Sequence, residues 1–113
     1  MIGRARLRPV QRLQSQVVAR VLKSGRSTRA QRFVLQSLPN EYQYPRLALV
    51  VPKRLVPRAV GRNRIRRLAR ESFRLRQREL GGRDVVIRLT RAPGPQPVTF
   101  QEIDAIIVSH CNA

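Results

Sequence analysis

Apolar side chains recur along the chain with the two spacings that distinguish helices from strands. Three segments have helical spacing, and three short apolar runs between turn residues predict strands. The polar stretch 26–30 predicts a loop. The resulting order, αββαβα, predicts an α+β fold, a small single-domain α-β sandwich. The predicted elements are a helix over 14–23, strands over 31–38 and 46–52, a helix over 58–80, a strand over 84–90 and a helix over 99–108.

The first two predicted strands, 31–38 and 46–52, are joined by a turn at 39–41, and this short connection predicts an antiparallel hairpin. Along the first strand, alternate side chains point to opposite faces. We predict that Phe33 lies in the core. The alternation places Phe33, Leu35 and Ser37 on one face and Val34, Gln36 and Leu38 on the other.

The predicted helix over 58–80 has an apolar side and a basic side. Arg76 falls within the apolar side, and we expect its stem to lie at the core edge while its charged head reaches solvent. Gly81 and Gly82 end the helix. The basic side, called the ridge below, is formed by Asn63, Arg67, Arg70, Arg74 and Arg78, and the apolar side by Ile65, Leu68, Ala69, Ser72, Phe73 and Leu80.

At the C-terminal end, Thr99 and Glu102 have the spacing of a capping box for the last helix. His110 and Cys111 are the only histidine and the only cysteine. These counts exclude a disulfide framework, a zinc site built on cysteines and a pair of histidine ligands. We interpret the two residues as a frayed helix end rather than a catalytic dyad, and we expect neither catalytic side chains nor a metal site on this chain.

The 113 residues carry 24 lysines and arginines against 6 acids, a net charge of +18. Residues 53–78 contain eleven of the basic residues and a single acid, Glu71, which we expect to pair within the helix with Arg67 or Arg74. The ridge otherwise lacks the acidic neighbours that offset repulsion on a solvated helix. A surface of one sign is tolerated when a polyanion neutralises it, and arginine binds phosphate through two donors. A nucleic-acid partner is therefore predicted.

Residues 1–13 are basic and aperiodic, and they predict a flexible arm before one RNA-binding domain over 14–113. No apolar run is long enough to span a membrane, and no apolar stretch follows the basic N-terminus as in a secretory signal. We expect a cytoplasmic protein, with a mitochondrial transit peptide as the alternative interpretation of the arm. The sequence has no helix-turn-helix, zinc-ligand or zipper pattern, and a basic helix beside a sheet favours RNA over DNA.

One region has a more specific pattern. The tripeptide Arg-Asn-Arg at 62–64 is followed by isoleucine, a basic pair and the sequence Arg-Glu-Ser-Phe-Arg at 70–74. A Lys-Arg pair, 53–54, follows the preceding strand, and an apolar strand that begins with aspartate follows the helix. With these motifs, residues 45–93 resemble the protein subunit of bacterial ribonuclease P. The resemblance is looser over the first helix and first strand and is lost at the two ends.

The resemblance implies a ribonucleoprotein endonuclease that removes the 5′ leader of precursor tRNA. In that family the catalytic centre and its magnesium belong to the RNA subunit, so no cofactor is expected on the protein. The implied partners are one catalytic RNA per protein and the precursor tRNA. The implied fold has a left-handed β-α-β crossover and is similar to some ribosomal-protein domains.

The resemblance also implies roles for individual residues. The Arg-Asn-Arg helix docks on the catalytic RNA, and a cleft between the first helix and the sheet holds the leader. Aromatic side chains that are common at the positions of Val18, Leu22 and Gln36 are absent here, so apolar and electrostatic contacts to the leader are expected, with a contact through Phe33 as the alternative. The implied RNA-binding residues are Lys53, Arg54, Arg62, Asn63, Arg64, Arg66, Arg67, Arg70 and Arg74, and the implied leader-cleft residues are Val18, Leu22, Val34 and Gln36.

Two alternative functions have distinct consequences. A structural RNA-binding protein of the ribosome would have the same basic composition, but it would not promote cleavage of precursor tRNA at low magnesium. A stand-alone ribonuclease would cleave RNA without an RNA subunit, and it would need side chains placed for acid-base catalysis.

Overall fold

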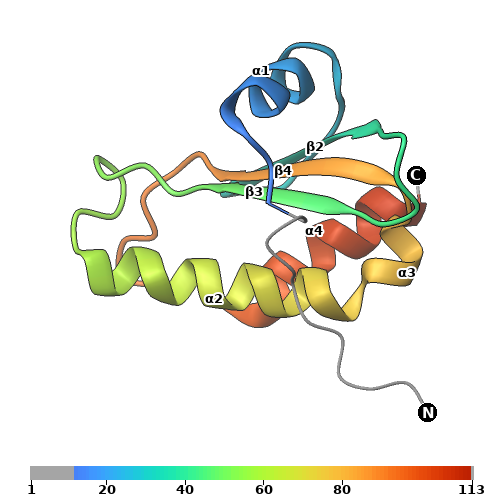
Figure 1. The fold of residues 1–113 in the computed structure, drawn as a ribbon. Helices are drawn as coiled ribbons and strands as arrows, with labels where there is room; N and C mark the ends of the chain where they lie inside the picture. The colour runs from blue at the N-terminus through green and yellow to red at the C-terminus, as the bar shows by residue number, and fades with distance from the viewer. Residues whose placement is uncertain (1–11, 113) are drawn as a thin grey trace.

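A four-stranded sheet lies between two helical layers, with α1 on one face and α2, α3 and α4 on the other (Figure 1). The structure is a computed structural model and describes residues 12–112. In chain order the elements are α1 (Ser15–Ser24), β1 (Arg26–Arg29), β2 (Phe33–Pro39), β3 (Arg46–Val50), α2 (Ala59–Leu75), α3 (Gln77–Leu80), β4 (Arg83–Leu89) and α4 (Phe100–Asn112).

The strands lie in the order β1-β2-β4-β3. β4 pairs antiparallel with β2 and parallel with β3, so the predicted hairpin between β2 and β3 is wrong. Val85, Val86 and Ile87 of β4 are all buried, and a strand that is apolar on both faces takes an inner position between two partners. β3 and β4 are connected through α2 and α3, which makes the parallel β-α-β unit that the resemblance implies. The left hand of this crossover stays a prediction.

The predicted loop over 26–30 is instead largely a strand, β1. β1 pairs antiparallel with β2, from Arg26 opposite Ser37 to Arg29 opposite Val34. Three of its four residues are exposed. This edge strand is held mainly by main-chain hydrogen bonds to β2. Because such bonds need no particular side chains, its sequence shows no apolar alternation from which a strand could be predicted.

The main core lies between the sheet and the layer of α2 and α4. The predicted faces of β2 are confirmed: Phe33 and Leu35 belong to this core, and the Ser37 hydroxyl contacts the His110 ring of α4. On the opposite face, the Gln36 side chain bonds to α1. The predicted apolar side of α2 is buried at Ile65, Ala69, Ser72 and Phe73.

The predicted helix over 58–80 is divided at Arg76 into α2 and α3. Arg76 has φ −104° and ψ 16°, and its guanidinium donates to the Asp104 carboxylate of α4 at 3.0 and 2.7 Å and to Glu79 at 3.2 Å. The Arg76 side chain is 35% exposed, so its head does reach the surface, where it forms an ion pair with Asp104 of α4 that the sequence did not indicate. The Arg76 hydrogen bond in turn lowers the pKa of Asp104. Gly81, with φ of 59°, ends α3.

The last helix begins as predicted and ends later. Thr99 caps α4, because its Oγ1 accepts the backbone N–H of Glu102 at 3.2 Å. Glu102 does not complete the predicted capping box, since its carboxylate pairs with Arg32. α4 continues to Asn112, and His110 is fully buried. The interpretation of this end as frayed is therefore wrong.

The predicted arm lies outside the described residues up to residue 11. Its last two residues, Arg12 and Leu13, run parallel to β3 beside Leu47. The backbone N–H of Leu13 donates to the carbonyl oxygen of Leu47 at 3.1 Å, which places the chain at the β3 edge of the sheet just before α1. Within residues 12–112, no helix is long and apolar enough to cross a membrane.

Candidate nucleic-acid interface

The ridge residues are exposed, except for Arg74, which is half-buried. Arg74 pairs with Glu71, which confirms the predicted pairing within the helix, and this hydrogen bond lowers the pKa of Glu71. Within residues 12–112, no carboxylate forms an ion pair with Arg67, Arg70 or Arg78. The greater part of the ridge is therefore a positive surface without an acidic partner in the described structure.

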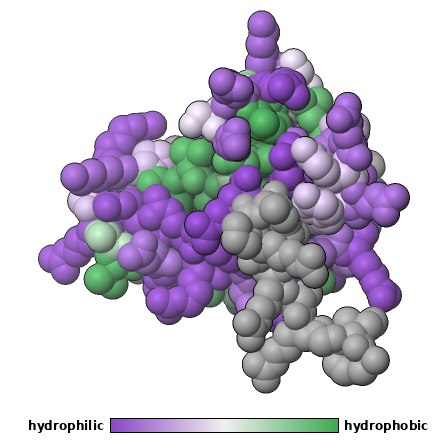
Figure 2. All heavy atoms as spheres, in the orientation of Figure 1, coloured by the Kyte–Doolittle hydropathy of each residue, from purple (hydrophilic) through white to green (hydrophobic). Residues whose placement is uncertain are grey.

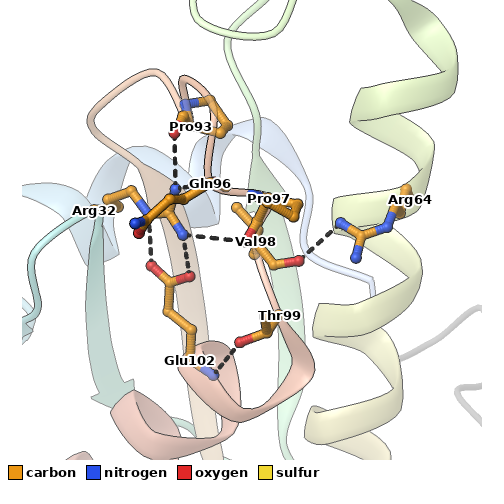
Figure 3. A network of polar contacts seen from close by, with 8 residues as sticks. All are labelled: Arg32, Arg64, Pro93, Gln96, Pro97, Val98, Thr99 and Glu102. Atoms are coloured by element: carbon orange, nitrogen blue, oxygen red, sulfur yellow. Dashed lines mark hydrogen bonds and ion pairs between the residues drawn. The ribbon is translucent and has the colours of Figure 1, made fainter.

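Both arginines of the Arg-Asn-Arg motif are hydrogen-bonded to the protein's own backbone. Arg62 donates from one Nη to the carbonyl oxygens of Val56 at 3.0 Å and Pro57 at 2.7 Å. Arg64 donates to the carbonyl oxygen of Val98 at 2.8 Å (Figure 3). These bonds fix the first turns of α2 against the loop before α2 and the loop before α4. Each guanidinium carries five N–H donors, so others remain for an external acceptor.

The loop that accepts the Arg64 hydrogen bond is itself held by Arg32, the residue just before β2 (Figure 3). Arg32 donates from Nε and one Nη to the Glu102 carboxylate at 2.8 and 2.5 Å. Its other Nη donates to the carbonyl oxygens of Pro93 at 3.1 Å and Gln96 at 2.6 Å. Arg32 was not among the predicted site residues, and it positions the backbone against which Arg64 anchors α2.

The remaining predicted RNA-binding residues continue the same basic surface. Lys53 and Arg54 are exposed in the turn between β3 and α2. Asn63 is exposed, and its side-chain oxygen accepts a long hydrogen bond of 3.5 Å from half-buried Arg66. This contact links Asn63 to a neighbouring arginine of the same helix. All nine predicted residues therefore lie on α2 or in the turn before it, and their role in RNA binding stays a prediction.

Two of the predicted leader-cleft residues lie on α1 and two on the sheet face that α1 covers, which is called the α1 face below. α1 packs on β2 and β4, and β3 lies beside that contact. Val34 and Gln36 of β2 are only 2% and 6% exposed, and Gln36 donates to the backbone carbonyl oxygen of Leu22 at 3.0 Å. Val18 is half-buried, and Leu22 is 38% exposed. Of the four predicted residues, the two on α1 are therefore the accessible ones.

The accessible floor of the α1 face lies on β3 and β4. The strand register places Arg88 between Val34 and Val50 on one face of the sheet, with Ala48 two residues before Val50. Ala48, Val50 and Arg88 are half-buried, and Arg88 Nε donates to the Gln36 side-chain oxygen at 3.4 Å. Figure 2 shows hydrophobic side chains gathered between α1 and the sheet within a mostly hydrophilic surface. Arg88 was not predicted as a site residue; its signal is a single charge inside an apolar strand.

His110, the one histidine available for acid-base chemistry, forms structural hydrogen bonds inside the fold. His110 contacts the Thr28 hydroxyl through Nδ1 at 2.7 Å and the Ser37 hydroxyl through Nε2 at 2.6 Å, so neither ring nitrogen serves Cys111. Burial lowers the pKa of His110 to about 4 and raises the pKa of the Cys111 thiol. Within the described residues, no three histidine, cysteine, aspartate or glutamate side chains lie close enough to share a metal ion.

Sequence comparisons identify similar proteins, and the family match covers most of the chain. The model of the family described as Ribonuclease P matches residues 8–109. The ribonuclease P protein component of Nitrosococcus oceani is 45% identical over 67 residues, which are 59% of this chain and 56% of that protein. The corresponding protein of Azotobacter vinelandii is 52% identical over 54 residues, 48% of this chain and 42% of that protein. The matched region thus spans about half the length of these relatives.

Solved structures extend the likeness to nearly the whole chain. The RNase P protein of Staphylococcus aureus has a TM-score of 0.73 at 28% identity, over 88% of this chain and 90% of that chain. The RNase P protein of Thermotoga maritima has a TM-score of 0.71 at 25% identity, over 94% of both chains. The α+β architecture described above is therefore shared with these proteins.

Proposed function

Because this chain belongs to the ribonuclease P protein family, we propose that it is the protein subunit of a ribonuclease P, the ribonucleoprotein endonuclease that removes the 5′ leader from precursor tRNA. One protein chain binds one catalytic RNA. The catalytic centre and its magnesium belong to that RNA, and this chain supplies no catalytic side chain. The observation that carries the proposal is the family match over residues 8–109.

The catalytic RNA docks on α2 and the turn before it. Support comes from the exposed arginines of the ridge, because guanidinium groups without acidic partners are available to phosphate oxygens. The backbone bonds of Arg62 and Arg64 hold the first turns of α2 in place, so the ridge meets the RNA as a rigid surface. Rigid donors lose little conformational entropy on binding.

The 5′ leader of the precursor lies along the α1 face, beside Val18 and Leu22. The apolar floor at Ala48 and Val50 accommodates bases and riboses, and Arg88 offers a guanidinium to a phosphate. Val34 and Gln36 support this surface from beneath α1 instead of contacting the leader directly. Contacts to the leader are lost on cleavage, so the precursor binds more tightly than the product and product release is favoured.

The high positive charge supports a lower magnesium requirement as part of this proposal. Two polyanions, the catalytic RNA and the precursor tRNA, repel each other when they associate. Arginines near both of them replace part of the counterion atmosphere, so less magnesium is needed to screen the repulsion. The net charge of +18 on 113 residues is consistent with this role.

Adding the chain to a bacterial ribonuclease P RNA is expected to accelerate cleavage of precursor tRNA at magnesium concentrations where the RNA alone is slow. Single-turnover cleavage across a magnesium titration, with and without the chain, measures the effect. The chain alone is the control and should leave the precursor intact, because cleavage without RNA would instead indicate a stand-alone ribonuclease. An unchanged magnesium dependence would contradict the proposal and favour a structural RNA-binding role.

Leu22→Asp is expected to lower the affinity of the assembled complex for precursor tRNA about fivefold, because one carboxylate beside the leader repels its phosphates by about 1 kcal/mol. Affinity for mature tRNA should stay unchanged, and the exposure of Leu22 allows the fold to tolerate the change. Leu22→Asn is the matched control, because it removes the same apolar side chain without adding a negative charge. Dissociation constants for both tRNAs measure the ratio, and equal losses for the two would argue against the cleft.

A further inference from the structure

A small hollow lies at the β3 edge of the sheet, lined by residues of the segment before α1, of β3 and of α2. Its volume is about 220 Å³. The hollow exists because the segment before α1 runs parallel to β3, with the Leu13 N–H bonded to the Leu47 carbonyl oxygen at 3.1 Å. The floor is apolar and is formed by Leu13, Leu47, Ala48 and Leu49.

The rim of the hollow carries three guanidinium groups from distant parts of the sequence. Arg12 comes from the segment before α1, and Arg66 and Arg70 come from successive turns of α2. No acidic residue lines the hollow within the described part of the chain. Burial lowers the pKa of Arg70, and the positive charges of Arg12 and Arg66 lower it further, so the three groups act on one another.

This arrangement raises the energy of the protein on its own. Three like charges over an apolar floor repel each other more strongly than in bulk water, and nothing in the described structure offsets that repulsion. An anion seated between them removes the repulsion and gains charge-assisted hydrogen bonds from several donors at once. The shape and charge of the hollow therefore suit a single phosphate group with an adjoining sugar over the apolar floor.

We propose that Arg12, Arg66 and Arg70 together bind one internucleotide phosphate of RNA in this hollow. The inference rests on the proposed function, and it adds a phosphate subsite that includes Arg12, a residue outside the predicted interface. The subsite lies beside β3, where an RNA strand passes between the ridge and the α1 face. Two RNAs can supply this phosphate, the catalytic RNA or the leader of the precursor, and the chemistry is the same for both.

Arg12→Gln in the full-length chain tests the subsite. Its affinity for RNA is expected to fall about tenfold, and the slope of log affinity against log salt should fall by about one, because one guanidinium-phosphate contact is lost. Arg29→Gln is the matched control: it removes the same charge from exposed Arg29 on β1, at the opposite edge of the sheet, and should change affinity less than twofold. Thermal unfolding of both variants verifies that the fold is retained.

A double-substitution cycle tests whether the guanidiniums share one phosphate. If they do, Arg12→Gln costs much less in an Arg70→Gln background than in the wild-type chain, because the phosphate is already poorly held. Contacts to separate phosphates would give additive losses. Additive losses, or an Arg12→Gln variant that behaves like Arg29→Gln, would overturn the proposal.

Two measurements identify the source of the phosphate. A loss of affinity for a bacterial ribonuclease P RNA alone assigns it to the catalytic RNA, and a loss confined to precursor over mature tRNA in the assembled complex assigns it to the leader. If Arg12→Gln lowers the affinity in neither measurement, the proposed subsite is overturned. Failure of the proposed function is distinguishable, because it appears as weak binding of ribonuclease P RNA by the wild-type chain. The same variants are then compared on a short single-stranded oligoribonucleotide, where equal affinity of Arg12→Gln and Arg29→Gln overturns the subsite on its own.

Discussion

Replacing Arg67 and Arg70 together with glutamate is expected to weaken binding of a bacterial ribonuclease P RNA at least about a hundredfold. Hydrogen bonds to charged groups contribute about 1.5–3 kcal/mol each, so two lost phosphate contacts account for two decades or more in the dissociation constant. The introduced carboxylates add repulsion. Both side chains are exposed, so the change acts on the interface and leaves the core intact.

Fluorescence anisotropy of labelled RNA over a range of salt concentrations measures both the affinity and its salt dependence. The slope should fall by about two, one for each phosphate contact. Arg20→Glu with Arg29→Glu is the matched control, since it changes the net charge equally at exposed positions of α1 and β1, across the sheet from α2. Equal losses for the two pairs would mean that net charge alone drives binding and that the ridge has no special role.

The ridge was predictable because its cause is local. A helix repeats its side-chain directions every few residues, so the spacing of Ile65, Ala69 and Phe73 was enough to separate the buried side of α2 from the basic side. The two faces of β2 were predictable for the same reason. In each case the pattern lies within one element and does not depend on how the elements pack.

Features that depend on packing between distant segments were missed. β1 has no apolar alternation, and only its pairing with β2 makes it a strand. The inner position of β4 between β2 and β3 was missed because the segments of all three strands are rich in apolar residues, so the apolar run of β4 did not single it out. The ion pair of Arg76 was missed because its partner, Asp104, lies on α4 and is remote in sequence.

The same limit applies to the candidate site. Motif residues 62–64 were identified, yet the backbone carbonyls that Arg62 and Arg64 contact lie on two loops whose positions the sequence does not indicate. Arg12 joins Arg66 and Arg70 only because the segment before α1 pairs with β3. Composition was therefore enough to predict a polyanionic partner. Which arginines lie around one hollow depends on the tertiary structure.

His110 connects three elements inside the fold and titrates with a perturbed pKa. Its ring bonds to Thr28 of β1 and Ser37 of β2, and its backbone oxygen accepts a hydrogen bond from Arg26 at 2.9 Å. Burial is the main cause that lowers the pKa from 6.5 to about 4, followed by the positive charges of Arg26 and Arg83. The folded protein therefore holds the ring neutral at pH values where the unfolded chain already binds a proton.

This difference makes acid destabilising. Because the unfolded state binds more protons between the two pKa values, the free energy of unfolding rises with pH in that range. The stabilising effect is complete above pH 6.5 and is lost as the pH falls toward 4, by about 3 kcal/mol from a pKa difference between 6.5 and about 4. Asp104, whose pKa lies below its ordinary value, loses its own contribution only at lower pH.

His110→Gln is expected to remove this pH dependence. The amide side chain can still hydrogen-bond to the Thr28 and Ser37 hydroxyls but does not titrate, so the variant should be less stable than the wild type at pH 8 by about 1–2 kcal/mol, from imperfect bonds at a buried site. Between pH 6.5 and 5 its free energy of unfolding should stay nearly constant while that of the wild type falls. Urea unfolding followed by circular dichroism at a series of pH values measures both curves. Parallel curves would place the acid sensitivity in other groups, because a neutral amide at position 110 carries no proton to lose or gain.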